Sequence, residues 1–345
     1  MPVETSATPA VSAPAWSAPA MLTGDVTLEA IREAAGLIAP YVVRTPTLPV
    51  GRLSELLGRP VVAKFEMLQH TGAFKARGAF HKMLRLSEAE RQAGVVAVSG
   101  GNHGLAVAYA ARVLELTATV IMPSTTAPAS VIQARADGAQ VVVTDTIAQA
   151  FANAVEEVGT GKVMIHPFDD PAVIAGQGTL GLELFEDAPQ VSDVVVSIGG
   201  GGMIAGVAVA LKALNPDIRI WGVETVGADA MTRSLAAGEP VTMDAITSIA
   251  TTLGAPTVSP RTLAAVQGLV TEVLLVSDRD AVQGIELLSE VSKVITEPAA
   301  ACTWPAAVAI SDGLPADAQV ALVLCGGNAS LNDIAGWRAA FAVAG

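Results

Sequence analysis

Short runs of β-branched residues alternate with longer amphipathic stretches along most of this chain. From Val95 onward, patterns with apolar residues at three- and four-residue spacing separate the runs VVAV, ATVIMP, AQVVVTD and KVMIHP. Continuous apolar runs of this length are typical of strands buried on both faces, and the intervening spacing is typical of helices. The pattern therefore predicts a parallel sheet whose strands are joined by helices.

The same rhythm continues on both sides of this segment. It predicts strands over residues 61–66, 191–198, 219–224 and 320–327, and helices over 26–42, 52–58, 173–187, 203–214 and 282–294. Residues 239–258 show no regular pattern. Alternating strands and helices indicate the α/β class with a doubly wound sheet, in which ligands bind outside the carboxyl ends of the strands.

Composition and charge exclude several classes of protein. The chain has 345 residues, enough for about two domains. Its net charge of −13 repels nucleic acid and anionic membranes, and no apolar run is long enough to span a bilayer. Two cysteines make neither a disulfide framework nor a cysteine metal site, so we expect a cytoplasmic protein. Residues 1–24, rich in proline and without Lys or Arg, predict a disordered tail.

Four consecutive glycines, Gly199, Gly200, Gly201 and Gly202, lie between a predicted strand and a predicted helix. Backbone without side chains lets successive N–H groups converge on an anion at the positive end of a helix. The loop therefore predicts a phosphate site. A merely flexible turn is the alternative, and Glu224 leaves a dinucleotide site open, whereas the Lys-Ser/Thr pair of a Walker loop is absent.

One lysine stands in an unusual context. Lys75 follows Phe74 in the segment HTGAFKARGAF, whose neighbours are largely apolar. An isolated lysine of this kind is usually a solvated helix residue. Together with a phosphate site on the same sheet edge, however, it has the properties needed to hold an aldehyde cofactor as a Schiff base.

A second glycine-rich loop begins at Ser99 and precedes a helical pattern that starts at Leu105. The N–H groups of Ser99, Gly100 and Gly101 are placed to bind a carboxylate, and Asn102 is placed to donate to a phenolic oxygen. His103 is a candidate general base, although a histidine in the first turn of a helix is more often structural.

Cys325 ends the last apolar strand, in the segment VLCGGN. A buried, unreactive residue is the usual role of a free cysteine, and no neighbouring Lys, Arg or His in sequence favours a thiolate. The functional alternative is a weakly polar thiol that faces the ring nitrogen of a ligand.

Five segments, HTGAFKARGAF, SGGNHG, GGGGMIAG, GVETVGADAM and VLCGGN, occur in this order and together resemble the fold-type II pyridoxal-phosphate enzymes. Within that class, which has the fold of the tryptophan synthase β subunit, the chain is similar to the serine/threonine dehydratase and serine racemase family. The resemblance covers residues 25–330. It implies two α/β domains with parallel sheets: a large cofactor-binding domain of residues 25–92 and 172–345, and a small mobile domain of residues 93–171.

The resemblance also implies roles for individual residues. Lys75 would bind pyridoxal 5'-phosphate as the internal aldimine, and Phe74 would pack near the ring. Asn102 would bond the phenolic oxygen and Cys325 the pyridine nitrogen, where many relatives have Ser. The phosphate would lie on Gly199, Gly200, Gly201 and Gly202, and the amino-acid substrate on Ser99, Gly100, Gly101 and His103. We expect a homo-oligomer, a dimer.

Three departures from the family pattern change the expected chemistry. Racemases resemble Ser-Ser-Gly-Asn-His at the first loop, where the second Ser acts as acid and base on the opposite face of the cofactor, and Gly100 stands there. The divalent-cation site retains Glu224 and Ala228, but its third position is Ala230, so we expect no metal. Residues 250–256 replace the family's Ala-Asp-Gly segment beside the substrate.

The predicted activity is that of a dehydratase, or ammonia-lyase, which converts L-threonine or L-serine to a 2-oxo acid and ammonia by β-elimination. Two alternatives remain open. One is elimination from a bulkier substrate such as phenylserine, hydroxyaspartate or diaminopropionate. The other is a phosphate-ligand binding protein without catalysis, in which Lys75 is only a surface charge.

Overall fold

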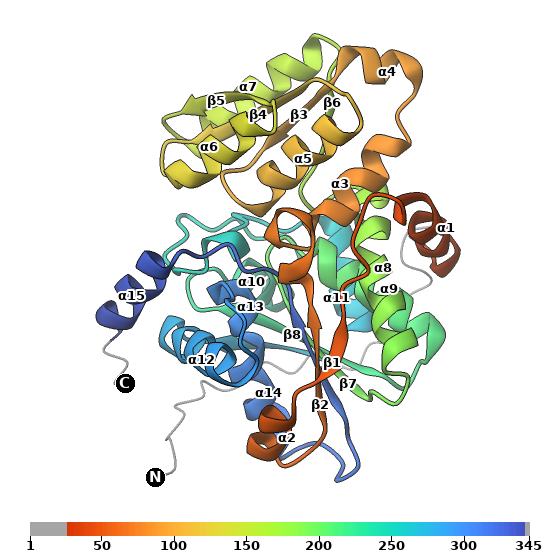
Figure 1. Cartoon of the computed structure of the whole chain (residues 1–345), viewed down its shortest axis with the longest axis vertical. Helices are drawn as coiled ribbons and strands as arrows, with labels where there is room; N and C mark the ends of the chain where they lie inside the picture. The colour runs from red at the N-terminus through yellow and green to blue at the C-terminus, as the bar shows by residue number, and fades with distance from the viewer. Residues whose placement is uncertain (1–25, 342–345) are drawn as a thin grey trace.

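The computed structural model describes residues 26–341, so the predicted disordered tail, residues 1–24, lies outside the described residues. Two sheets organise this part of the chain (Figure 1). The larger has the strand order β1-β2-β10-β7-β8-β9 and the smaller the order β5-β4-β3-β6. We call the parts built on them the large lobe and the small lobe.

The strand and helix bounds are as follows. The strands are β1 Thr47–Pro49, β2 Val61–Phe65, β3 Val95–Val98, β4 Ala118–Pro123, β5 Gln140–Thr144, β6 Val163–Met164, β7 Asp193–Ser197, β8 Arg219–Thr225, β9 Glu272–Val276 and β10 Val320–Leu324. The helices are α1 Leu28–Ile38, α2 Gly51–Leu57, α3 Lys75–Leu84, α4 Glu88–Ala93, α5 Asn102–Val113, α6 Pro128–Ala136, α7 Ile147–Gly159, α8 Pro171–Asp187, α9 Gly202–Leu214, α10 Ala230–Ala237, α11 Pro260–Leu269, α12 Asp278–Val291, α13 Pro298–Ala301, α14 Thr303–Ser311 and α15 Leu331–Ala340.

Helices cover the sheets as expected for strands that are apolar on both faces. In the large lobe, α1, α8, α9 and α11 pack against one another on one side, and α2, α12 and α14 lie on the other (Figure 1). The central strands β2, β7 and β10 are buried along their whole length. In the small lobe, α5, α6 and α7 pack on β3, β4 and β5. The α/β fold with parallel sheets is therefore confirmed.

Several details differ from the sequence prediction. The large sheet is not wholly parallel, because the edge strand β1 pairs antiparallel with β2. The strand β9 was not predicted, since it lies at the sheet edge and is only partly buried. The helix predicted from Leu105 begins at Asn102, which places that residue in its first turn. The predicted domain boundaries at residues 92 and 172, and the mobility of the small domain, stay predictions.

A buried cluster of charged side chains joins β2, α3 and α8. The guanidinium of Arg77 donates to both carboxylate oxygens of Glu66, each at 2.8 Å, and to those of Glu183 at 2.7 and 2.8 Å. Lys64 donates to Glu183 and to the carbonyl of Thr45, both at 2.6 Å. Two cations face two anions, so the cluster is neutral. Because Arg77 lies two residues after Lys75, the cluster fixes the start of α3.

The electrostatics of the cluster depend on its pairing. Burial alone would raise the pKa of Glu66, but the charge and hydrogen bonds of Arg77 outweigh burial and hold this pKa below its ordinary value. Burial lowers the pKa of Lys64. Removing one member would therefore leave an unpaired charge in a largely buried site.

We expect Arg77→Met to lower the free energy of unfolding by about 3–5 kcal/mol, because it leaves Glu66 buried without its ion-pair partner and leaves Glu183 with Lys64 alone. Denaturant unfolding at neutral pH measures this loss. Arg85→Met is the matched control, since Arg85 follows α3 and pairs with Glu33 at the exposed surface. That variant should lose no more than about 1 kcal/mol. Equal losses in the two variants would contradict the role assigned to the cluster.

Candidate active site

Four of the predicted site segments come together where the two lobes meet. Lys75 begins α3, the four glycines follow β7, Cys325 follows β10, and Asn102 begins α5 in the small lobe. The backbone N–H of Phe74 donates to the carbonyl of Cys325 at 3.1 Å. Three of these segments follow the parallel strands β2, β7 and β10, whose carboxyl ends share one edge of the large sheet, and Asn102 follows β3 of the small sheet.

The amine of Lys75 is partly buried and lies close to the backbone and to an aromatic ring. Its Nζ donates to the carbonyl of Pro167 at 2.7 Å and lies 5.0 Å from the centre of the Phe74 ring. Burial lowers the pKa of Lys75 to about 8, and the nearby groups of Cys325 and Glu297 oppose this shift only in part. A large fraction of the amine is therefore neutral and nucleophilic near neutral pH.

The turn before Lys75 is strained and is attached to the end of β10. Thr71 has a positive φ of 61°, which β-branched residues rarely adopt. Its carbonyl accepts from the side chain of Asn328 at 2.8 Å, and the carbonyl of Gly72 accepts from the N–H of Gly327 at 2.9 Å. These bonds stabilise the turn, and strain of this kind is common at functional sites.

Asn102 is held by two residues of the large lobe. Its Nδ2 donates to Glu297 at 2.8 Å, and its Oδ1 accepts from Asn328 at 2.7 Å. Since an amide nitrogen has two hydrogens, Nδ2 retains one donor for a ligand. Asn102 thus links the small lobe to the end of β10 while keeping the capacity that the sequence predicted for it.

Glu297 was not predicted from the sequence. Its Oε1 accepts from Asn102 and, at 3.0 Å, from Thr252, whereas its buried Oε2 has no hydrogen-bond partner among the described residues. Burial raises the pKa of Glu297. The available signal was a lone acidic residue directly before Pro298 and the apolar segment of α13.

The thiol of Cys325 is buried and neutral. Ser197, at the end of β7, donates to its Sγ at 3.4 Å. Burial raises the pKa of Cys325 to about 12 and the negative charge of Glu297 adds to the effect, so the group stays a thiol throughout the physiological range. A weakly polar group of this kind at the sheet edge can contact a ring nitrogen without bringing a charge.

The four-glycine loop is shaped by close contacts. An added Cβ would lie 2.1 Å from the Phe168 ring at Gly200 and 2.8 Å from Phe168 at Gly202, so side chains have no room at either position. Gly201 has a φ of +89° and precedes the first residue of α9 without any side-chain cap. A helix of 13 residues therefore presents its positive end at bare backbone, which fits a phosphate group.

The loop over Ser99, Gly100 and Gly101 leads into α5, and its Gly101 N–H donates to the Ser99 hydroxyl at 3.1 Å. His103 is buried, and its Nε2 lies 2.7 Å from the carbonyl of Ile165. Burial lowers the pKa of His103 to about 3, and the positive charge of Lys75 adds to the shift. A ring held to backbone in this way favours the structural role over that of a general base.

Comparison with known proteins agrees with this geometry. A family model described as pyridoxal-phosphate dependent enzyme matches residues 38–326. The chain belongs to this family. It is 39% identical over 311 residues to an L-threonine ammonia-lyase of Thermotoga maritima, and the match covers 90% of this chain and 77% of the relative. It is 40% identical over 302 residues to a phenylserine dehydratase of Ralstonia pickettii, with 87% and 93% covered.

A solved structure gives the same result for the fold. Maize serine racemase superposes with a TM-score of 0.86 at 34% identity, covering 92% of this chain and 98% of that one. The predicted fold type II, the cofactor and the prediction of a pyridoxal-phosphate dependent enzyme are confirmed by these matches. The roles of the individual site residues stay predictions.

The residues of this pyridoxal-phosphate dependent enzyme fit its cofactor. A nucleophilic amine, a bare helix terminus for a phosphate and a neutral thiol lie at the edge of the large sheet, and a free amide donor faces them from the small lobe. The buried Oε2 of Glu297 is an additional polar atom that lacks a protein partner there.

Glu224, which matches the first residue of the family's divalent-cation site, accepts hydrogen bonds from the protein itself. It accepts from the N–H groups of Met231 at 2.9 Å and Thr232 at 2.8 Å, and from the Thr232 hydroxyl at 2.6 Å. Burial raises its pKa to about 7. Glu224 therefore caps the start of α10, and no group of three metal-binding side chains occurs within residues 26–341. The expectation of no metal stays a prediction.

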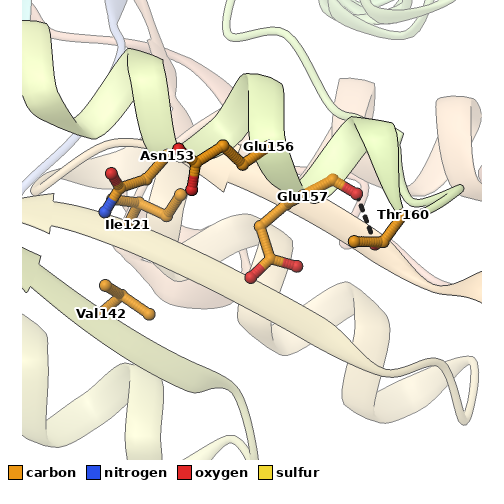
Figure 2. Close-up of a pocket in the computed structure, with 6 residues that line it drawn as sticks. All are labelled: Ile121, Val142, Asn153, Glu156, Glu157 and Thr160. Atoms are coloured by element: carbon orange, nitrogen blue, oxygen red, sulfur yellow. Dashed lines mark hydrogen bonds between the residues drawn. The ribbon is translucent and has the colours of Figure 1, made fainter.

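Two further observations concern the rest of the molecule. Figure 2 shows a cavity of about 240 Å³ on the small lobe, lined by strand residues Ile121 and Val142 and by side chains of α7 and its end. It contains none of the predicted site residues. Within the described residues, no helix is long and apolar enough to cross a membrane.

We expect the cofactor-free protein to bind pyridoxal phosphate covalently at a rate that rises with pH through about 8, because the neutral amine of Lys75 is the nucleophile. At pH 7.5 about a quarter of such an amine is neutral, against about one part in a thousand for an ordinary lysine. Absorbance at several pH values, followed by borohydride reduction and peptide mapping, measures the rate and the position. Lys75→Ala should take no label. A midpoint near 10.5, or label on another lysine, would contradict this assignment.

Proposed function

We propose that this chain is a dehydratase that eliminates water from an L-β-hydroxy amino acid, threonine or serine. Water is taken up again as ammonia is released, so the products are a 2-oxo acid and ammonia. The observation that carries the proposal is the partly buried amine of Lys75, which shares one site with the neutral thiol of Cys325. The matching ammonia-lyase supports the same reaction type.

The residues that would hold the cofactor are those that the sequence predicted. Gly199, Gly200, Gly201 and Gly202 bind its phosphate through backbone N–H groups at the start of α9. Asn102 donates its remaining amide hydrogen to the phenolic oxygen, and Phe74 packs beside the ring. When bound, the cofactor withdraws electrons from the substrate Cα and makes its proton acidic.

Lys75 has two tasks in this site. It would hold the cofactor covalently through its amine. When free, the same amine would serve as the base that accepts the proton from Cα, which its lowered pKa allows near neutral pH. The first turn of α5, with Ser99, Gly100 and Gly101 before it, binds the substrate carboxylate.

Cys325 determines how the electrons are used. Because its thiol stays protonated and uncharged, Cys325 would contact the ring nitrogen of the cofactor without bringing a charge. A ring held in this way would be a weaker electron acceptor, which would favour loss of the β-hydroxyl over storage of negative charge. Gly100 has no hydroxyl, so Lys75 is the one proton-transferring group of this proposal. We therefore expect elimination to exceed racemisation.

A bulkier substrate is the second candidate. The phenylserine dehydratase of Ralstonia pickettii is 40% identical to the chain. Residues 250–256 replace the family's Ala-Asp-Gly segment, so this segment offers no carboxylate to the substrate. Its Thr252 hydroxyl donates to Glu297. A larger β-substituent would have to lie against this segment.

The test is a screen for 2-oxo acid release with L-threonine, L-serine and phenylserine. We expect the highest kcat/KM with threonine or serine, and a loss of about 10³-fold or more in Lys75→Ala, since both anchor and base are removed. The D-isomer is assayed in the same reactions. Preference for phenylserine would select the second candidate, and accumulation of D-serine as fast as pyruvate would refute the argument from Gly100.

A further inference from the structure

The side chain of Thr126 occupies the space in which a side chain on Gly100 would lie. A Cβ added to Gly100 would be 2.1 Å from Thr126 Oγ1, 3.0 Å from its Cβ and 3.2 Å from its Cγ2. Thr126 belongs to the turn after β4, where its N–H donates to the carbonyl of Pro123 at 2.9 Å. A side chain at Gly100 would therefore require the Thr126 side chain to move.

The hydroxyl of Thr126 has no hydrogen-bond partner. Its Oγ1 is buried, and no described residue lies within bonding distance. Three other hydroxyls of the small lobe have protein partners: Ser124 donates to Asp145, Thr144 donates to Thr146, and Thr119 accepts from Lys162. A buried hydroxyl without a partner destabilises the fold, so its partner is expected to be a water molecule or a ligand.

The position of this hydroxyl identifies the kind of partner. It lies against Gly100, one residue before Gly101, which precedes α5 without a side-chain cap. Asn102, the first residue of α5, is attached to Glu297 inside the proposed cofactor site. An anion that approaches this helix end therefore meets the positive end of α5 and the Thr126 hydroxyl together.

We propose that Thr126 is a substrate-binding residue whose hydroxyl donates a hydrogen bond to the carboxylate of the amino-acid substrate. This inference rests on the proposed function, because it takes the substrate to be an amino acid at the first turn of α5. Gly100 and Thr126 act together, because the missing side chain of Gly100 leaves room for the Thr126 hydroxyl, which is the hydrogen-bond donor. Thr126 takes no part in proton transfer at Cα.

The first experiment compares three variants of the cofactor-loaded enzyme. Thr126→Val removes the hydroxyl and keeps the shape, Thr126→Ser keeps the hydroxyl, and Thr125→Val changes the exposed neighbour as the control. We expect Thr126→Val to raise KM by about 10-fold or more, the effect of one lost hydrogen bond to a charged group, with a smaller change in kcat. Thr126→Ser and Thr125→Val should stay within about threefold of wild type for the same reason.

Stability and binding provide readouts that do not need turnover. Because Thr126→Val removes a hydroxyl without a protein partner, its Tm should equal or exceed that of wild type. Calorimetry with L-alanine, an amino acid that has no β-leaving group, should show weaker binding to Thr126→Val by the same factor as the change in KM. A lower Tm together with unchanged KM and unchanged Kd would assign Thr126 a purely structural role and overturn the proposal.

A second pair of variants tests the packing between the two loops. Gly100→Ala should lower Tm in wild type, because its Cβ meets Thr126, and should lower it less in a Thr126→Gly background, where that contact is gone. Equal losses in both backgrounds would refute the pairing. If the wild type releases no 2-oxo acid, the proposed dehydratase function fails, yet the calorimetric comparison of Thr126→Val with wild type still decides whether Thr126 binds an amino acid.

Discussion

The buried pairing of Arg77 with Glu66 and Glu183 is the constraint on which the geometry of the site depends. It joins the end of β2 to α3 and α8 through charge-assisted hydrogen bonds in a largely buried region. Such a cluster holds one arrangement strongly, because any displacement separates charges that solvent cannot screen. Lys75 begins the helix that Arg77 anchors, so the position of its amine follows from this cluster.

Around that amine, burial shifts the pKa of each group toward its uncharged form. Burial lowers the pKa of Lys75 and raises those of Cys325 and Glu297, so that each shift favours the uncharged form. The shared cause is the apolar edge of the sheet, where charge is expensive unless it is paired. A neutral amine can attack an aldehyde and accept a proton, which is the chemistry that the family requires of this residue.

Polar atoms without protein partners mark where ligands are expected. Glu297 Oε2 lies beside the proposed cofactor position, and Thr126 Oγ1 lies beside the start of α5. The strained turn at Thr71 adds to the same region. A protein bears such local costs at its functional sites and compensates for them elsewhere, here through fully buried strands such as β7 and β10.

The residue types and their spacing along the chain predicted the buried strands and the position of the site. The apolar runs predicted the buried strands, and the motifs around Lys75, Asn102, the four glycines and Cys325 placed the site at the carboxyl ends of those strands. Only the tertiary structure showed which residues distant in sequence contact the site and which strands pair at the sheet edges. Glu297 and Thr126 reach the site from segments distant in sequence, the antiparallel β1 and the edge strand β9 are set by what they pair with, and the space beside Gly100 is filled from another loop. Such contacts depend on how lobes and loops pack, which periodicity along one chain does not record.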